Sequence, residues 1–394
     1  MKQIKIAFLS SFFTILIVSA LFAIFYYNDG FAKNTNNQSD ENNLSTTIER
    51  VSLTDSISNS RETVITQTIK NTSPAVVGIN VVELREIRSP WYNFFRDDPY
   101  FRDYFSRQQR VQGLGSGYII SPDGYIVTND HVAGNAVQVI VTMTDGKQYE
   151  AKVIGSDMAS DICLLKIDAD NLPYIPFGRS DDLLIGEWVV ALGNPFGLFG
   201  INDKPAVTVG VISSTEMNLG QKNNRYYVNM IQTDAAINAG NSGGPLVNSL
   251  GELIGMNTLI FTASGSQGNV GIGFAIPVDK IKKIVSELKL NGKVDRDFWT
   301  GLRIQTVDEG IAKYYNLQTT RGVIVTNVTA DSPAEKADIK VGDIILRVDK
   351  YIINDDNTLI GVLQEFKTGD SLSLTIVREN QTISKTIKLE KRND

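Results

Sequence analysis

The sequence has a single cysteine and a single histidine among its 394 residues. Cys163 therefore has no partner for an intrachain disulfide bond and cannot build a cysteine-rich metal site. His131 alone excludes any site that needs two imidazoles. An excess of positive charge is also missing, because the formal net charge is −6. A protein that binds nucleic acid by neutralising phosphates is therefore not expected, and any histidine chemistry must involve His131.

The composition is that of a folded protein. Apolar residues make up 42% and charged residues 21% of the chain, which is enough apolar surface to form a core and argues against disorder. The length allows two or three domains. We predict a membrane anchor or uncleaved signal at residues 1–28, a flexible linker at 29–60, one domain at 61–294 and a second domain at 297–391.

The N-terminus carries a long uncharged run, Ala7–Tyr27. As a helix it would extend about 30 Å, the thickness of the hydrocarbon core of a bilayer. Lys2 and Lys5 before it predict that the N-terminus stays in the cytoplasm and that the rest of the chain is exported. We favour a retained anchor, and a removed signal peptide is the alternative. The polar stretch that follows, to about Ser60, is typical of a flexible tether.

From about Val64 the chain becomes a series of short apolar, β-branched runs separated by turn residues. Strands at this spacing without alternating helices predict a mainly β fold with antiparallel sandwiches or barrels. One helix is expected at Pro277–Leu290, where apolar residues recur at helical spacing. The expected strands are Ala75–Val82, Gly117–Ile120, Tyr125–Thr128, Val137–Thr142, Ile162–Ile167, Trp188–Leu192, Val207–Ser213, Leu246–Asn248, Leu253–Leu259 and Gly271–Ala275.

Three residues together supply the roles that acyl transfer requires. His131 follows a short strand, Asp161 precedes an apolar strand, and Ser242 lies in the glycine-rich turn Gly240–Leu246. Each alone is more often structural. Together they provide a nucleophile, a base of a residue type whose pKa lies near the working pH, and a carboxylate that orients the base. The glycines expose the serine and allow the N–H groups of Gly240 and Ser242 to face a developing oxyanion.

At this level of detail the chain resembles the HtrA (Deg, or Do) serine proteases. The resemblance covers about residues 64–391 and rests on Gly113–Gly117, Thr128–Val132, Asp161 and Thr233–Asn238 leading into Gly240–Leu246. It implies a trypsin-like double β-barrel at 61–294 that cuts unfolded polypeptides without ATP, cofactor or metal. His131 would be the base, Asp161 its orienting carboxylate and Ser242 the nucleophile. Asp130 stands where the family often has Asn, and we expect no effect of this difference on catalysis.

The same resemblance indicates the pocket for the side chain that precedes the scissile bond. Matching to the family places Ala236, Ile237, Phe261 and Ile272 there. No carboxylate is among them, so small or medium aliphatic side chains are expected in preference to Arg or Lys. Cys163, the other conceivable nucleophile, lies in an apolar strand and is expected to be buried in the core.

An aromatic-rich segment separates Arg88 from Gly113. Its position matches the long loop that reaches a neighbouring subunit in degradative members of the family, and we interpret it as an oligomer or lid contact. Local packing on its own barrel and contact with a membrane surface are the alternatives. A homo-oligomer is implied by the resemblance alone, with a trimer as the expectation from the family.

Residues 297–391 resemble a single PDZ domain, which binds the C-terminus of a peptide as an added strand. The resemblance places the carboxylate-binding loop at about Thr300–Leu302 and an apolar groove beside it. For the last two groove residues, a place in the domain core is an equal alternative. The expected peptide-binding residues are Thr300, Gly301, Leu302, Ile304, Ile360 and Leu363.

Three functions stay open at this stage. The first is an envelope protease, anchored in the inner membrane with its catalytic domain in the periplasm or exported after signal cleavage, that degrades misfolded proteins and binds C-terminal peptides. The second is a regulatory protease that cuts one anchored substrate when its PDZ domain senses a stress peptide. The third is a scaffold without catalysis. We also hypothesise that the loop Glu216–Tyr227 carries the PDZ signal.

Overall fold

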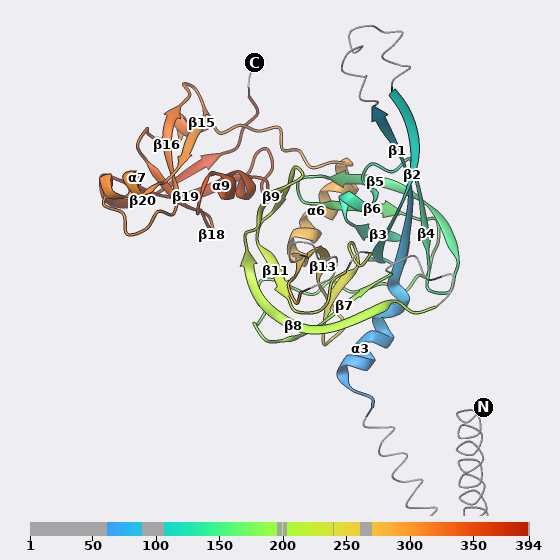
Figure 1. Ribbon diagram of the computed structural model, residues 1–394. Coiled ribbons are helices and arrows are strands. Elements are labelled where there is room, and N and C mark those ends of the chain that lie inside the picture. Colours follow the sequence, from blue (N-terminus) through green and yellow to red (C-terminus); the bar gives the residue numbers. More distant parts are fainter. Residues whose placement is uncertain are drawn as a thin grey trace, which may run out of the picture. The chain divides into compact units, whose positions relative to one another are not determined.

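The computed structural model describes residues 61–88, 106–194, 199, 203–238, 240–260 and 270–392 (Figure 1). The predicted anchor Ala7–Tyr27, the linker at 29–60, the aromatic segment at 91–105 and Phe261 lie outside these residues. Within the described part of the chain, no helix has the length and apolarity needed to cross a bilayer. The described residues from Val64 onward belong to one compact unit.

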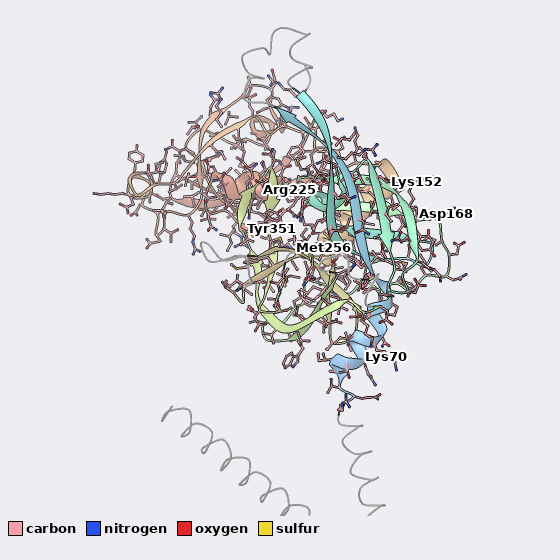
Figure 2. The ribbon with its side chains drawn as sticks, turned by 45° about the vertical axis from the view of Figure 1, so that its right-hand side comes forward. Lys70, Lys152, Asp168, Arg225, Met256 and Tyr351 are labelled. Atoms are coloured by element: carbon pink, nitrogen blue, oxygen red, sulfur yellow. The ribbon has the colours of Figure 1, made fainter. Side chains whose placement is uncertain are left out.

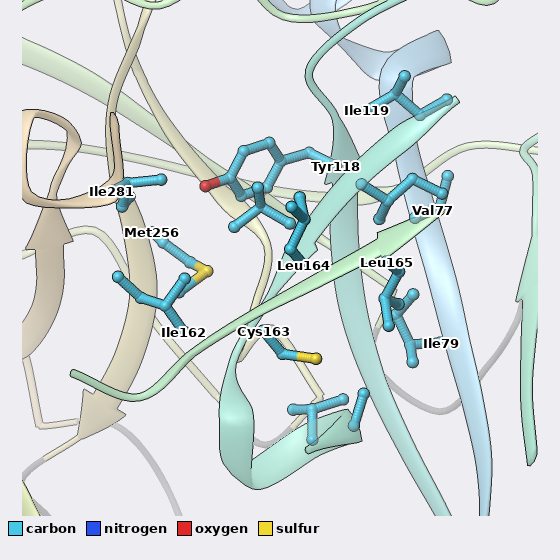
Figure 3. Packing of buried hydrophobic residues seen from close by; sticks show 14 of the residues in the cluster. Val77, Ile79, Tyr118, Ile119, Ile162, Cys163, Leu164, Leu165, Met256 and Ile281 are labelled. Carbon is cyan, nitrogen blue, oxygen red and sulfur yellow. The ribbon is translucent and has the colours of Figure 1, made fainter. Parts of the chain in front are cut away.

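The first half of the unit is a closed β-barrel in the order β1-β2-β3-β6-β5-β4. All neighbouring strands run antiparallel. Ile79, Tyr118 and Leu164 are fully buried in its core (Figure 3). The strands are β1 (Val76–Arg88), β2 (Ser106–Ile119), β3 (Tyr125–Thr128), β4 (Gln138–Thr142), β5 (Gln148–Asp157) and β6 (Ile162–Lys166).

A second closed barrel follows in the order β11-β14-β13-β12-β7-β8. The helix α6 (Val278–Asn291) follows its last strand and is capped by Gly292, which has a positive φ of 70°. Met256 of this barrel and Ile281 of α6 share one core with the first barrel (Figure 3). The strands are β7 (Trp188–Gly193), β8 (Ala206–Met217), β11 (Met230–Thr233), β12 (Pro245–Asn248), β13 (Leu253–Ile260) and β14 (Gly273–Pro277). The prediction of a mainly β double barrel is confirmed.

The C-terminal residues form a separate antiparallel sheet with its own hydrophobic core. Asp308, Ser332 and Asp355 each cap a helix by accepting a backbone N–H with the side chain. The strands are β15 (Leu302–Thr306), β16 (Val323–Val328), β17 (Ile344–Val348), β18 (Tyr351–Ile352), β19 (Ser371–Arg378) and β20 (Gln381–Lys388), and the helices are α7 (Glu309–Tyr314), α8 (Pro333–Lys336) and α9 (Asp356–Leu363).

The structure differs from the predicted elements at several places. Residues Val64–Thr72, where the β pattern was expected to begin, form the helix α3, followed by the 3₁₀ turn η1 (Ser73–Ala75). Thr68 Oγ1 on α3 donates to the carbonyl of Ser249, 2.7 Å away, and so ties the helix to the second barrel. The strand β2 begins at Ser106 and not at Gly117, because β1 and β2 pair all the way out to Arg88 and Ser106.

Other elements had no prediction at all. The strand β5 carries exposed charged residues, such as Lys152, that dilute its apolar pattern (Figure 2). The short helix α5 (Asp130–Ala133) and the hairpin of β9 (Gly220–Lys222) and β10 (Arg225–Tyr227) are each only a few residues long. Elements of this length show too little periodicity to be detected from sequence.

Candidate active site

His131 lies in α5, directly after β3, and its side chain is 34% exposed. Its ring atom Nδ1 is 2.9 Å from Oδ1 and 2.8 Å from Oδ2 of Asp161. The backbone N–H of His131 also donates to Oδ1 over 3.0 Å. The carboxylate therefore fixes both the ring and the backbone of the histidine. With Nδ1 engaged in this way, the other ring nitrogen, Nε2, is the atom available to take a proton.

Asp161 is completely buried at the entrance to β6, with a positive φ of 59°. Aspartate tolerates this left-handed conformation better than most residues. Asn129 supports the turn by donating its side-chain amide to the Asp161 carbonyl over 3.0 Å. Oδ2 accepts from Thr258 Oγ1 at 2.8 Å and from the Tyr227 hydroxyl at 3.2 Å. These donors replace the water that the buried carboxylate has lost.

The electrostatic consequence is a carboxylate that stays ionised despite burial. Burial by itself raises the pKa of Asp161, but the hydrogen bond and charge of His131, together with the Thr258 hydroxyl, outweigh it and hold the pKa below the usual value. The pKa of Tyr227 is raised by burial and by the Asp161 carboxylate. Tyr227 therefore remains a protonated donor to Asp161.

Ser242 lies in the turn that leads from β11 into β12. Its Oγ donates to the carbonyl of Thr258 over 3.1 Å, and among the described residues no hydrogen bond joins it to His131. Catalytic hydrogen bonds of free enzymes often tighten only when substrate binds. Gly243 has a φ of 84°, and a Cβ there would lie 2.2 Å from the Ser116 carbonyl. The turn therefore requires glycine at this position.

The predicted oxyanion donors lie in the same turn. Gly240 has a φ of 91°. Within the described part of the chain, no hydrogen bond occupies the N–H of Gly240 or of Ser242. Both donors are therefore available to a ligand.

Ser116 of the first barrel holds this turn of the second barrel in place. Its N–H donates to the Ser242 carbonyl at 3.0 Å, and its hydroxyl donates to the Gly240 carbonyl at 2.5 Å. The same hydroxyl accepts from the N–H of Asn194 at 2.7 Å, and its own carbonyl accepts from Thr128 Oγ1 at 2.7 Å. The buried Ser116 thus connects the strand before His131 with the turn that carries Ser242.

The structure describes three of the four residues predicted for the specificity pocket. Ile237 is buried beside Gly273, since a Cβ added at Gly273 would lie 2.8 Å from Cδ1 of Ile237. The carbonyl of the half-buried Ala236 accepts from Thr208 Oγ1 at 2.8 Å. Ile272 is exposed just before β14. The fourth residue, Phe261, lies outside the described residues.

Cys163 is fully buried in β6, as predicted (Figure 3). Burial raises the pKa of its thiol to about 12, so the thiol is protonated and unreactive. Among the described residues, no cluster of three or more His, Cys, Asp or Glu side chains is arranged to hold a metal ion.

Sequence reasoning missed three residues around the carboxylate: Thr258, Tyr227 and Arg225. The Nε atom of Arg225 lies 3.0 Å from Asp161 Oδ1. All three come from the second barrel or its hairpin, far along the chain from Asp161. The Thr128–Val132 segment gives no hint of them, and an alternating strand pattern does not show which partner a buried Thr will contact.

Five of the six residues predicted to bind a peptide lie together on the C-terminal domain. Thr300, Leu302, Ile304, Ile360 and Leu363 line an apolar groove of about 200 Å³ between β15 and α9. Gly301 turns the chain beside the groove with a φ of 78°, and a Cβ there would lie 2.0 Å from Ser332 Cβ. Ile360 is 40% exposed, which places it at the groove surface and not in the domain core.

Two family models match the chain. Residues 115–256 match a trypsin-like peptidase domain, and residues 301–389 match a PDZ domain. A probable periplasmic serine endoprotease, DegP-like, of Pseudomonas fulva is 41% identical over 327 residues, which cover 82% of this chain and 66% of the relative. The equivalent protein of Hahella chejuensis is 39% identical, with 82% and 68% covered. The chain thus spans about two thirds of the length of these relatives.

Solved structures cover this chain to a similar extent. The HtrA-type protease AlgW with a decapeptide has a TM-score of 0.61 and 36% identity, over 83% of this chain and 98% of that one. A serine endoprotease from Yersinia pestis has a TM-score of 0.53 and 35% identity, over 84% and 99%.

Proposed function

Because this chain belongs to the HtrA-type family of serine endoproteases, we propose that it degrades unfolded polypeptides in the bacterial cell envelope by acyl transfer at Ser242. The observation that carries this proposal is the buried Asp161 carboxylate, whose Oδ1 lies 2.9 Å from His131 Nδ1. Ser116 of the same barrel donates a hydrogen bond to the Gly240 carbonyl, in the turn that carries Ser242. The periplasmic relatives support the envelope as its location.

In the proposed reaction, Ser242 turns its hydroxyl from the Thr258 carbonyl to Nε2 of His131. Nε2 takes the proton as Oγ attacks the scissile carbonyl, and Asp161 stabilises the resulting imidazolium. The N–H groups of Gly240 and Ser242 stabilise the oxyanion. His131 then protonates the leaving amine, and a water activated by His131 hydrolyses the acyl-enzyme. The pocket residues Ala236, Ile237, Phe261 and Ile272 are apolar and include no carboxylate, which favours Val, Ala or Ile before the scissile bond.

The groove between β15 and α9 is proposed to bind peptide C-termini. A peptide would extend the sheet along β15, place its carboxylate at Thr300–Leu302 and its last side chain against Ile304 and Ile360. The AlgW structure with a decapeptide supports peptide binding by this family. Residues 1–28 are proposed to anchor the chain in the inner membrane, and the segment at 91–105 to contact a neighbouring copy in a homo-oligomer.

A regulatory function is the second candidate, and one contact favours it. Val228 belongs to the core cluster of the PDZ domain, and Gly361 of α9 faces the side chains of Val228 and Tyr226. The hairpin β9–β10 within the loop Glu216–Tyr227 therefore touches both α9 and, through Tyr227, the carboxylate of Asp161. A peptide that shifts α9 would act on the catalytic cluster through this loop.

The test uses the full-length chain in detergent micelles, with Ser242→Ala as the matched inactive control. Reduced casein is incubated with each protein alone, with a peptide ending in a free carboxylate, and with the same peptide amidated. Many fragments from the wild type without peptide support degradation. Cleavage that needs the free-carboxylate peptide supports the regulatory function. If the wild type and Ser242→Ala give the same result under every condition, the chain is not a protease and a scaffold function remains.

A further inference from the structure

Arg225 is a buried cation at the catalytic carboxylate. It lies on β10 (Figure 2). Its side chain is only 12% exposed. Its Nη2 donates to Asp130 Oδ2 over 2.6 Å. Its Nε lies 3.0 Å from Asp161 Oδ1 without a hydrogen bond to any described residue, so this contact is an ion pair. The guanidinium thus joins Asp161 to the residue directly before His131.

Asp130 is equally well held. Its side chain is 5% exposed, and Oδ1 accepts from Ser156 Oγ at 2.6 Å. Gly134 makes room for this carboxylate, because a Cβ there would lie 2.0 Å from Oδ1. Asp130 is therefore a fixed negative charge and not a flexible surface residue.

Two acidic side chains and one basic side chain lie next to His131. Burial alone lowers the pKa of Arg225, but Asp161 and Asp130 outweigh burial and raise it, so the guanidinium is always charged. The other titratable groups that face the cluster are Tyr227 and Cys163. Burial raises the pKa of both, so both are neutral at working pH. Among the described residues, the charges next to His131 are thus one cation, Arg225, between two carboxylates, Asp161 and Asp130.

A cation at this distance opposes the carboxylate's effect on the imidazole. Asp161 stabilises the imidazolium that forms when His131 takes a proton, whereas a guanidinium on the same carboxylate destabilises it. A second carboxylate that pairs with the guanidinium offsets that effect. Asp130 and Arg225 therefore place two opposite charges beside the contact between Asp161 and His131.

We propose that Arg225 and Asp130 form a positioning pair that sets the pH above which His131 acts as a base. Arg225 lowers this pH, and Asp130 raises it. The inference rests on the proposed catalytic role of His131. It gives the hairpin β9–β10 a chemical effect at the base in addition to its contact with α9.

The test compares four full-length proteins: wild type, Arg225→Gln, Asp130→Asn and the double variant. In kcat/KM against pH for a fluorogenic peptide, the acidic limb of Arg225→Gln moves up by about one pH unit, because the imidazolium loses a repelling charge. The limb of Asp130→Asn moves down by about half a unit. The double variant lies closer to the wild type than either single variant. Arg225→Lys, which keeps the charge, restores most of the wild-type midpoint.

A merely structural pair gives a different result. Loss of either partner then lowers kcat or the melting temperature in the same way, and the midpoints stay together or move in one direction. That outcome overturns the proposal. If Arg225→Gln does not fold, Asp130→Asn and Arg225→Lys decide, since only the proposal predicts a downward shift for the first and a near-wild-type midpoint for the second.

One property of the chain separates this inference from the proposed function. Because His131 is the only histidine, the Cε1–H signal of histidine-labelled protein titrates without assignment. The same substitutions are made in the Ser242→Ala background and the titration midpoints are read by NMR. Opposite shifts without any peptidase activity in the parent would refute the protease and keep the charge pair. Peptidase activity in the parent protein, together with unshifted His131 midpoints in the variants, would support the protease and refute the charge pair.

Discussion

The cluster around His131 and the PDZ domain both contain an aspartate with a lowered pKa, but for different reasons. Asp161 is fully buried, and the donors of His131 and Thr258 must overcome its burial. Asp338 is 54% exposed, and its pKa is lowered well below the usual range mainly by hydrogen bonds from Lys385 and Arg378. If the Asp161 carboxylate loses a hydrogen-bond partner, no water can replace it, because the carboxylate is buried. Water can replace a lost partner at the exposed Asp338. Similar pKa directions therefore conceal very different dependence on each contact.

The largest expected effect is at Asp161. In Asp161→Asn the carboxylate that accepts the hydrogen bond from Nδ1–H is replaced by an amide, so His131 adopts the wrong tautomer and kcat falls about 10⁴-fold with little change in KM. Steady-state kinetics on an aliphatic peptide substrate measure this. Asp338→Asn is the matched control and retains wild-type kcat. A loss of less than tenfold for Asp161→Asn would contradict the proposed role.

Ser116 is the next strongest test of the buried cluster. Ser116→Ala removes the hydroxyl that holds Gly240 and leaves the buried N–H of Asn194 without its partner. We expect a loss of about 1–3 kcal/mol in the free energy of unfolding and a fall of about 10- to 100-fold in kcat, because the turn loses its support. Denaturant unfolding and kinetics are measured together. Ser384→Ala, at an exposed hydroxyl pair, should change neither; equal effects of both would refute a special role for Ser116.

The PDZ groove should respond in binding and not in catalysis. Ile360→Ala removes a half-exposed apolar side chain, so affinity for a free-carboxylate peptide falls about tenfold, while basal kcat and stability stay near wild type. Fluorescence anisotropy with a labelled peptide measures the affinity. Val341, which is exposed outside the groove residues, supplies the control Val341→Ala. Marked destabilisation by Ile360→Ala would return Ile360 to the domain core.

The smallest effect is expected at Asp338. Its lowered pKa stabilises the folded state above the usual pKa of about 4 for an unfolded aspartate. That contribution is lost as pH falls through the lower folded-state pKa. Asp338→Asn should therefore melt slightly below the wild type at pH 7, and the two curves should converge in acid. Calorimetry between pH 2 and 7 follows the difference, and a gap that widens in acid would contradict the assigned direction.

The sequence predicted those features that depend on residue type and local spacing. The mainly β fold follows from the short apolar runs and the turn residues. The double barrel, the C-terminal PDZ domain and the family, which the resemblance to HtrA proteases implied, are confirmed. The pairing of His131 with Asp161 was also expected, because the chain has only one histidine to act as a base. The helix α6 was expected within a residue or two of its ends.

The remaining features depend on contacts between distant segments. Arg225 lies in a hairpin of three-residue strands, and nothing in its neighbours indicates an ion pair 95 positions away at Asp130. From the sequence, no effect of Asp130 on catalysis was expected, whereas its buried contact with Arg225 is the basis of a proposed one. The positive φ of Asp161 is likewise a product of the folded surroundings.

The division of the site between two barrels has a consequence for newly made chains. His131 and Asp161 belong to the first barrel and Ser242 to the second, and Ser116 joins them only when both have closed. A half-folded copy therefore has a base without a nucleophile, or a nucleophile without a base. For a protease whose proposed substrates are unfolded chains, its own nascent copies are at risk. Because a copy becomes active only when it is completely folded, it cannot digest other copies that are being made at the same time and are still folding. By the time it is active, those copies are also folded, and a folded chain is a poor substrate.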